Sequence, residues 1–178
     1  ARLWPALKQA NGARVVCLSS RGHFFSGVDF EDPFFQQRPY DKWVAYGQSK
    51  TANILFAVGL DARGEAHGVR AFAVHPGGIL TDLARHMSEE EIRASIENSN
   101  KVEPLKTVEQ GAATTVWCAT SPQLAGKGGV YCENVDIAVM APADATIRRG
   151  VKDQAVDPKR ADRLWSASET WTGVRFNP

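Results

Sequence analysis

Cysteine, long apolar runs and an excess of charge of either sign are all scarce in this chain. Its three cysteines share no Cys-x-x-Cys or metal-ligand spacing, which excludes a disulfide framework and a cysteine-held metal and favours reduced thiols in the cytoplasm. No apolar run approaches the length that spans a bilayer, and the first residues do not have the layout of a signal peptide. The net charge of +1, with both signs mixed, argues against nucleic-acid and membrane-surface partners.

The composition is that of one globular domain, which we assign to residues 1–178. Apolar residues make up 43% of the chain and charged residues 23%, as is usual for globular proteins. The length is sufficient for a sizeable hydrophobic core. The chain contains no internal repeat, no low-complexity tract and no stretch that reads as an interdomain linker.

Short apolar runs alternate with helical patterns along the chain. Residues 14–19 predict a strand buried on both faces, residues 69–75 a second strand and residues 129–132 a short third one. Helical spacing of apolar residues predicts helices over 1–10, 42–64, a short segment after 88, 107–120 and 158–173. The segment 141–157 reads as a loop. This alternation predicts an α/β fold with a parallel sheet of about three strands and flanking helices.

Local signals mark where three of these helices begin. Asp41 is a candidate cap for the helix over 42–64. Ser88 with Glu91, and Thr107 with Gln110, have the spacing of capping boxes, in which the two side chains bond each other's backbone N–H groups.

Residues 21–40 follow neither a helical nor a strand pattern and are rich in aromatic side chains. Six of them are aromatic: Phe24, Phe25, Phe30, Phe34, Phe35 and Tyr40. Such a loop usually packs on itself as a satellite cluster, which is the interpretation we favour. The alternative is that it walls a pocket for a hydrophobic carbonyl compound.

The helix over 42–64 carries a phenol and an ammonium four residues apart. Tyr46 and Lys50 therefore project from the same face of the helix. An ammonium beside a phenol favours the phenolate, so the pair can exchange a proton with a substrate oxygen near neutral pH. Lys50 also has donors to spare for ribose hydroxyls. The plainer interpretation of the same spacing is an exposed helix face.

Two further candidates lie where predicted strands end. Ser20 follows the first strand, and a hydroxyl there can orient a substrate oxygen, because ligands of open α/β sheets collect at the carboxyl ends of strands. Residues 75–78, His-Pro-Gly-Gly, follow the second strand, and their glycines allow close approach of a ligand. The backbone N–H groups of Ile79 and Thr81 could hold an amide. Taken alone, either segment is more often a cap or a turn.

A serine hydrolase is a weaker alternative for these residues. It would pair Ser19 or Ser20 with His75 or His86. No Gly-x-Ser-x-Gly elbow is present, and His75 directly precedes a turn at a strand end.

Residues 46–50, Tyr-Gly-Gln-Ser-Lys, taken together with residues 14–20 and 74–81, resemble the short-chain dehydrogenase/reductase family. The resemblance is greater to the branch that contains the retinol dehydrogenases, and it extends through residues 109–113 and 128–131. It implies the carboxyl-terminal portion of a Rossmann-like, doubly wound parallel sheet. It also implies an oxidoreductase that transfers a hydride between NAD(P)(H) and a small carbonyl or alcohol substrate.

The resemblance implies a role for each matched residue and no metal. Tyr46 would be the acid/base catalyst, Lys50 its electrostatic partner and a ribose ligand, and Ser20 the residue that holds the substrate oxygen. The nicotinamide end of the cofactor would contact Pro76, Gly77, Ile79 and Thr81, as well as Tyr46 and Lys50. The cofactor would be NADP or NAD, with NADP slightly preferred, and segment 82–105 would form a substrate lid. The resemblance leaves a homo-oligomer open.

The family's other signatures are missing from these residues. They contain no Thr-Gly-x-x-x-Gly-x-Gly phosphate loop, no Asn-Asn-Ala-Gly segment, no helix asparagine and none of the family's first four strands. We therefore expect the residues to belong to a longer protein. The alternative is a non-catalytic remnant or interaction module that keeps the fold without binding a cofactor.

Overall fold

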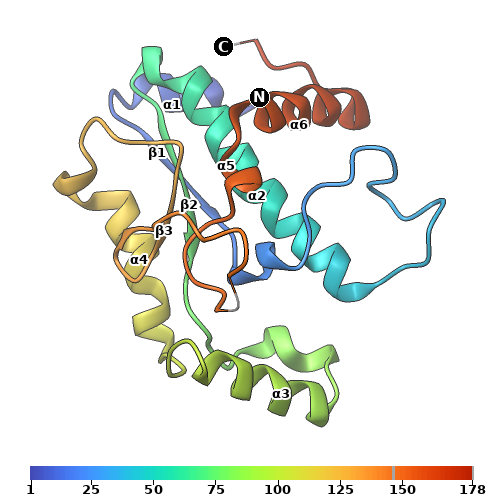
Figure 1. Ribbon diagram of the computed structural model, residues 1–178. Helices are drawn as coiled ribbons and strands as arrows, with labels where there is room; N and C mark the ends of the chain where they lie inside the picture. Colours follow the sequence, from blue (N-terminus) through green and yellow to red (C-terminus); the bar gives the residue numbers. More distant parts are fainter. Residues whose placement is uncertain (146, 178) are drawn as a thin grey trace.

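A four-stranded sheet with strand order β1-β2-β3-β4 runs through the middle of the molecule (Figure 1). The computed structural model describes residues 1–145 and 147–177. Strands β1 (Arg14–Leu18), β2 (Arg70–His75) and β3 (Val130–Glu133) are parallel, which confirms the predicted α/β fold and its three strands. The two-residue strand β4 (Asp136–Ile137) adds an antiparallel edge that the sequence did not predict.

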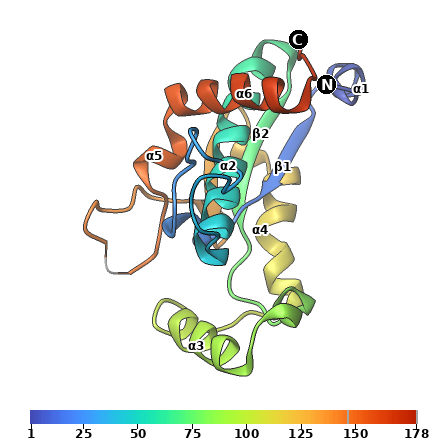
Figure 2. The same cartoon turned by 90° about the vertical axis from the view of Figure 1, so that its right-hand side faces the viewer.

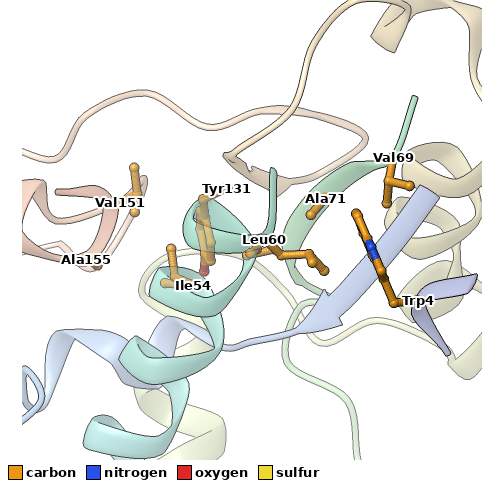
Figure 3. Packing of buried hydrophobic residues seen from close by; sticks show 10 residues of the cluster. Trp4, Ile54, Leu60, Val69, Ala71, Tyr131, Val151 and Ala155 are labelled. Atoms are coloured by element: carbon orange, nitrogen blue, oxygen red, sulfur yellow. The ribbon is translucent and has the colours of Figure 1, made fainter. Parts of the chain in front are cut away.

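Helices cover both faces of the sheet. The helices are α1 (Trp4–Gln9), α2 (Lys42–Gly64), α3 (Glu89–Asn100), α4 (Val108–Thr120), α5 (Asp153–Val156) and α6 (Pro158–Thr172). Side chains of β2 alternate between the faces: Ala71 and Ala73 pack toward α2, and Phe72 and Val74 pack toward α4. Figure 3 shows the cluster on the α2 side, where Ile54 lies near the ring of Tyr131.

The expectation that residues 14–19 are buried on both faces is wrong. The strand ends at Leu18, which is 52% exposed, and the other residues of β1 are only half-buried. Within the described part of the chain β1 pairs on one side only, with β2, whereas β2 has neighbours on both sides and is buried from Ala71 to His75. Its apolar sequence could not reveal this edge position.

Helix α2 matches its predicted range, and its start is fixed by Asp41. The carboxylate of Asp41 accepts hydrogen bonds from the N–H groups of Trp43, at 2.8 Å, and Val44, at 2.9 Å. Both predicted capping boxes are present, at the starts of α3 and α4. The interpretation of 141–157 as a loop is wrong at α5, whose single turn is too short to show a helical period.

The carboxyl ends of β1, β2 and β3 meet at one edge of the sheet. Helix α3 lies beyond this edge and apart from the sheet in both views (Figures 1 and 2), and none of its residues is buried. No helix among residues 1–145 and 147–177 has both the length and the apolar content to cross a bilayer.

Candidate active site

Ser20 and Tyr46 lie side by side at the carboxyl end of β1, with Gly22 between them. Ser20 has extended backbone and caps a 3₁₀ turn (Arg21–Phe24), where its Oγ accepts a hydrogen bond of 3.0 Å from the N–H of Gly22. A Cβ atom on Gly22 would lie 2.7 Å from Cδ1 of Tyr46 and 3.4 Å from Oγ of Ser20. The phenol ring therefore rests on a position where only glycine fits.

Lys50 lies next to Tyr46, one turn further along α2. Its Nζ is 5.4 Å from the centroid of the Tyr46 ring and 3.5 Å from the carbonyl oxygen of Leu18. Partial burial lowers the pKa of the Lys50 ammonium from its ordinary value. The structure thus brings together the three residues that the sequence singled out for chemistry.

The hydroxyl of Ser20 keeps its own hydrogen free. Its oxygen accepts from Gly22, and among the described residues nothing accepts the Ser20 O–H. The neighbouring Ser19 is buried, and its hydroxyl donates a hydrogen bond of 2.8 Å to the carbonyl oxygen of Lys50. This bond connects the end of β1 to α2. Of the two serines, only Ser20 has an O–H available to a ligand.

The arrangement does not support a hydrolase. Nδ1 of His75 accepts a hydrogen bond from the N–H of Arg21, and Nε2 of His86 accepts one from Nε of Arg85. Within the part of the chain that the structure describes, no hydrogen bond joins either histidine to the hydroxyl of Ser19 or Ser20. The base that a serine nucleophile needs is therefore not in place.

The segment after β2 leaves backbone donors open at the same edge of the sheet. Gly77 has a φ of +104°, a left-handed conformation that glycine adopts without strain. Among the described residues, the N–H groups of Ile79 and Thr81 donate to no acceptor. The hydroxyl of Thr81 caps the turn Asp82–His86, accepting from the N–H of Leu83 at 3.4 Å. These donors are the kind of group that holds a ligand amide.

A cluster of charged groups at this edge was missed by the sequence analysis. The guanidinium of Arg21 bonds the carboxylate of Glu103 at 2.8 Å and lies 3.9 Å from that of Glu133. Asn134 donates to the other oxygen of Glu103 at 2.9 Å, and burial raises the pKa of the Glu133 carboxyl. Because Arg21 and Glu103 are 82 positions apart, only the fold reveals their contact. The pair ties the segment that follows α3 to the sheet.

Some side chains of the aromatic loop, residues 21–40, are packed in the core and others are exposed to solvent. Phe24 and Val28 are buried, as expected for a satellite cluster, whereas Phe34 and Tyr40 are mostly exposed. The exposed rings help to line a hollow of about 350 Å³ between the loop, α2 and α6. The residues that line it include neither Ser20, Tyr46 nor Lys50, so this hollow is separate from the candidate site. Residues 1–145 and 147–177 contain no cluster of side chains suited to a metal ion.

Comparison with known proteins gives relatives over most of the chain, although no family model matches it. A probable oxidoreductase of Streptomyces lividans is 47% identical in an alignment of 168 positions that covers 92% of this chain and 56% of that protein. The short-chain dehydrogenase/reductase prx1 of Penicillium roqueforti is 36% identical, over 88% of this chain and 46% of its own. Human (Homo sapiens) retinol dehydrogenase 13 is 32% identical, over 94% of this chain and 48% of its own. The chain spans about half the length of these relatives.

Solved structures show the same fold. A crystal structure of an uncharacterized protein from Mycobacterium paratuberculosis has a TM-score of 0.62 and 27% identity, over 93% of this chain and 52% of its own. A 3-oxoacyl-[acyl-carrier protein] reductase from Brucella melitensis has a TM-score of 0.51 at 20% identity, over 74% and 44%. BdcA in complex with NADPH has a TM-score of 0.50 at 20% identity, over 69% and 44%. By its relatives and its fold, the chain belongs to the short-chain dehydrogenase/reductase family.

Proposed function

We propose that the protein to which these residues belong is an oxidoreductase that transfers a hydride between a nicotinamide cofactor and a small carbonyl or alcohol substrate. The observation that carries the proposal is the placement of Ser20, Tyr46 and Lys50. A free hydroxyl and a phenol lie on either side of Gly22, and an ammonium lies beside the phenol. The names of the relatives, a probable oxidoreductase and a retinol dehydrogenase among them, support it.

Each side chain has one task in carbonyl reduction. Ser20 donates its free O–H to the substrate oxygen and thereby orients it. Tyr46 gives its proton to that oxygen as negative charge develops there, and takes one from an alcohol in the reverse direction. The positive charge of Lys50 stabilises the phenolate that remains.

The residues that follow β2 fit the nicotinamide end of the cofactor. The open N–H groups of Ile79 and Thr81 suit a carboxamide, and Pro76 and Gly77 would lie under the ring. Lys50 would hold the ribose. When bound, the cofactor supplies or accepts the hydride. NADP is our preference over NAD, supported only by the NADPH that one fold neighbour, BdcA, contains.

A survey with both cofactors tests this function. The protein at its native length is mixed with NADPH or NADH and a set of aldehydes and ketones, and with the oxidised cofactors and the matching alcohols. We expect turnover with at least one substrate class, which is measured as the change in absorbance of the reduced nicotinamide. A protein that neither binds nor turns over either cofactor would be the non-catalytic alternative.

Substitution of Gly22 by alanine is expected to lower kcat by about 10- to 100-fold. The added Cβ would collide with the Tyr46 ring, and a shift of about 1 Å in a reacting group costs up to about 100-fold. Gly27→Ala is the matched control, because its Cβ would meet only the flexible ends of Gln154 and Arg160, at 3.0 and 3.4 Å. Steady-state kinetics and Tm are measured for both variants. Equal kcat values in the two would show that Gly22 does not set the position of the phenol.

A further inference from the structure

Two buried histidines hold one peptide group from opposite sides. The group joins Ser20 to Arg21, directly after the hydroxyl that we place against the substrate. Nδ1 of His23 lies 2.8 Å from the carbonyl oxygen of Ser20. Nδ1 of His75 accepts the N–H of Arg21 at 3.2 Å. His23 is fully buried and His75 is 5% exposed, so water does not compete for these bonds.

The partners decide which nitrogen of each ring carries the hydrogen. A carbonyl oxygen can only accept, so Nδ1 of His23 must be protonated. Its Nε2 accepts a hydrogen bond of 3.3 Å from the backbone N–H of Lys152 and must therefore be unprotonated. In His75 the order is reversed, because Nδ1 accepts from Arg21 and the hydrogen of the neutral ring is on Nε2. A second proton on either ring would place an N–H donor opposite a backbone N–H donor, that of Lys152 for His23 and that of Arg21 for His75, and the hydrogen bond would be lost.

We propose that His23 and His75 are positioning residues that act, as neutral imidazoles, through the Ser20–Arg21 peptide to keep the Ser20 hydroxyl beside Tyr46. The inference rests on the proposed function, since it gives a purpose to the placement of Ser20. Rotation of this peptide would move Ser20 and would also move Gly22. The N–H of Gly22 donates to Oγ of Ser20, and the Tyr46 ring packs against Gly22. The two ring bonds oppose that rotation, together with the hydrogen bond of 3.1 Å that the backbone N–H of His23 donates to the same carbonyl oxygen.

The surroundings of His23 keep its ring uncharged. Its ring lies edge-on to Tyr131, with centroids 5.1 Å apart, and the charged groups that face it are Lys152 and Arg21. Burial, and then these two cations, lower the pKa of His23 to about 4, against the opposing effect of the Ser20 bond. The ring is therefore neutral at physiological pH.

The surroundings of His75 act in the same sense. It faces Arg21, Glu103, Lys106 and His23, of which Glu103 alone favours a charged ring, with its Oε1 at 3.9 Å from Nε2. Burial, and then Arg21, lower the pKa of His75 to about 3.

Amide substitutions separate the two bonds of His23. Asparagine can place an N–H near the position of Nδ1, and glutamine can place its amide near that of Nε2. We expect His23→Gln to lower kcat about tenfold and His23→Asn to lower it far less, with the KM for the cofactor unchanged in both. His67→Asn is the matched control, because His67 is exposed at the other end of β2. Equal kcat values for His23→Asn and His23→Gln would overturn the inference.

A second measurement does not depend on activity. Nitrogen-15 NMR of the native-length protein should show His23 protonated on Nδ1 and His75 on Nε2 at pH 7. The Arg21 amide hydrogen should exchange with solvent about fivefold faster in His75→Leu, which lacks its acceptor, since one such hydrogen bond is worth about 1 kcal/mol. The opposite tautomers, or an unchanged exchange rate, would overturn the inference. Correct tautomers and exchange in a protein without turnover would instead refute the proposed function.

Discussion

Replacement of Tyr46 by phenylalanine is expected to lower kcat by about 10²- to 10⁴-fold, the usual worth of a positioned general acid or base. The variant removes one hydroxyl group and keeps the ring that rests on Gly22. Folding and cofactor binding should therefore be nearly unchanged, and the loss should fall on the proton-transfer step. Steady-state kinetics of the native-length protein, with Tm and cofactor affinity measured alongside, separate these effects.

Tyr40→Phe is the control for the loss of a hydroxyl. Tyr40 belongs to the aromatic loop and is 71% exposed, and its ring contacts Phe35 edge-on. We expect this variant to keep the kcat of the wild-type protein. A Tyr46→Phe variant that also kept it would remove the phenol from the proposed chemistry and leave Ser20 and Lys50 without their partner.

The parts of the fold that the sequence predicted are those that local signals determine. Helix α2 begins after Asp41 because the Asp41 carboxylate satisfies the first N–H groups, and α-helical spacing of apolar residues continues to its end. Tyr46 and Lys50 had to be neighbours once this helix was recognised. The two capping boxes could be predicted for the same reason, since each lies within four consecutive residues.

The parts that were missed depend on contacts between distant segments or on very short elements. Strand β4 follows a tight turn in which Asn134 and Val135 both have positive φ, a turn usually marked by Asn-Gly, and valine there hides the signal. The edge position of β1 depends on which strands pair with it, which its own residues do not encode. The bond between Arg21 and Glu103 joins segments that no local pattern relates.

The same limit applies to the candidate site. The sequence predicted that Ser20 and residues 75–78 would lie at the carboxyl ends of strands, and that Tyr46 and Lys50 would share one face of a helix. It singled out His75 only as part of the turn after the second strand and as a candidate hydrolase base, and it gave no signal for His23. A buried histidine has no pattern of its own, and the roles of His23 and His75 follow only from the partners that the loops bring to their ring nitrogens.

Lowering the pH below about 6.5 is expected to destabilise this fold, because two buried histidines are held neutral in it. The pKa of His23 is about 4 and that of His75 about 3 in the folded protein, against an ordinary value of 6.5. Between pH 6.5 and 4 the unfolded chain therefore binds protons that the folded protein excludes. Well below pH 6.5, each histidine should lower the free energy of unfolding by about 1.4 kcal/mol per pH unit, up to about 3 kcal/mol by pH 4. Such losses are large beside typical stabilities of about 5–15 kcal/mol.

Urea unfolding at a series of pH values from 7.5 to about 4.5 measures this effect. His23→Asn and His75→Asn should each flatten the dependence of the unfolding free energy on pH, whereas His67→Asn leaves this contribution in place. Glu133 acts in the opposite sense, because its raised pKa lets the folded protein take up a proton above the ordinary value of 4.5. The lowered pKa of Glu103 acts in the same sense as the histidines, so the histidine contribution is taken from the difference between each variant and the wild-type protein. Identical pH dependence in the wild-type and the two buried-histidine variants would mean that neither ring is held neutral by the fold, whether or not the proposed function is correct.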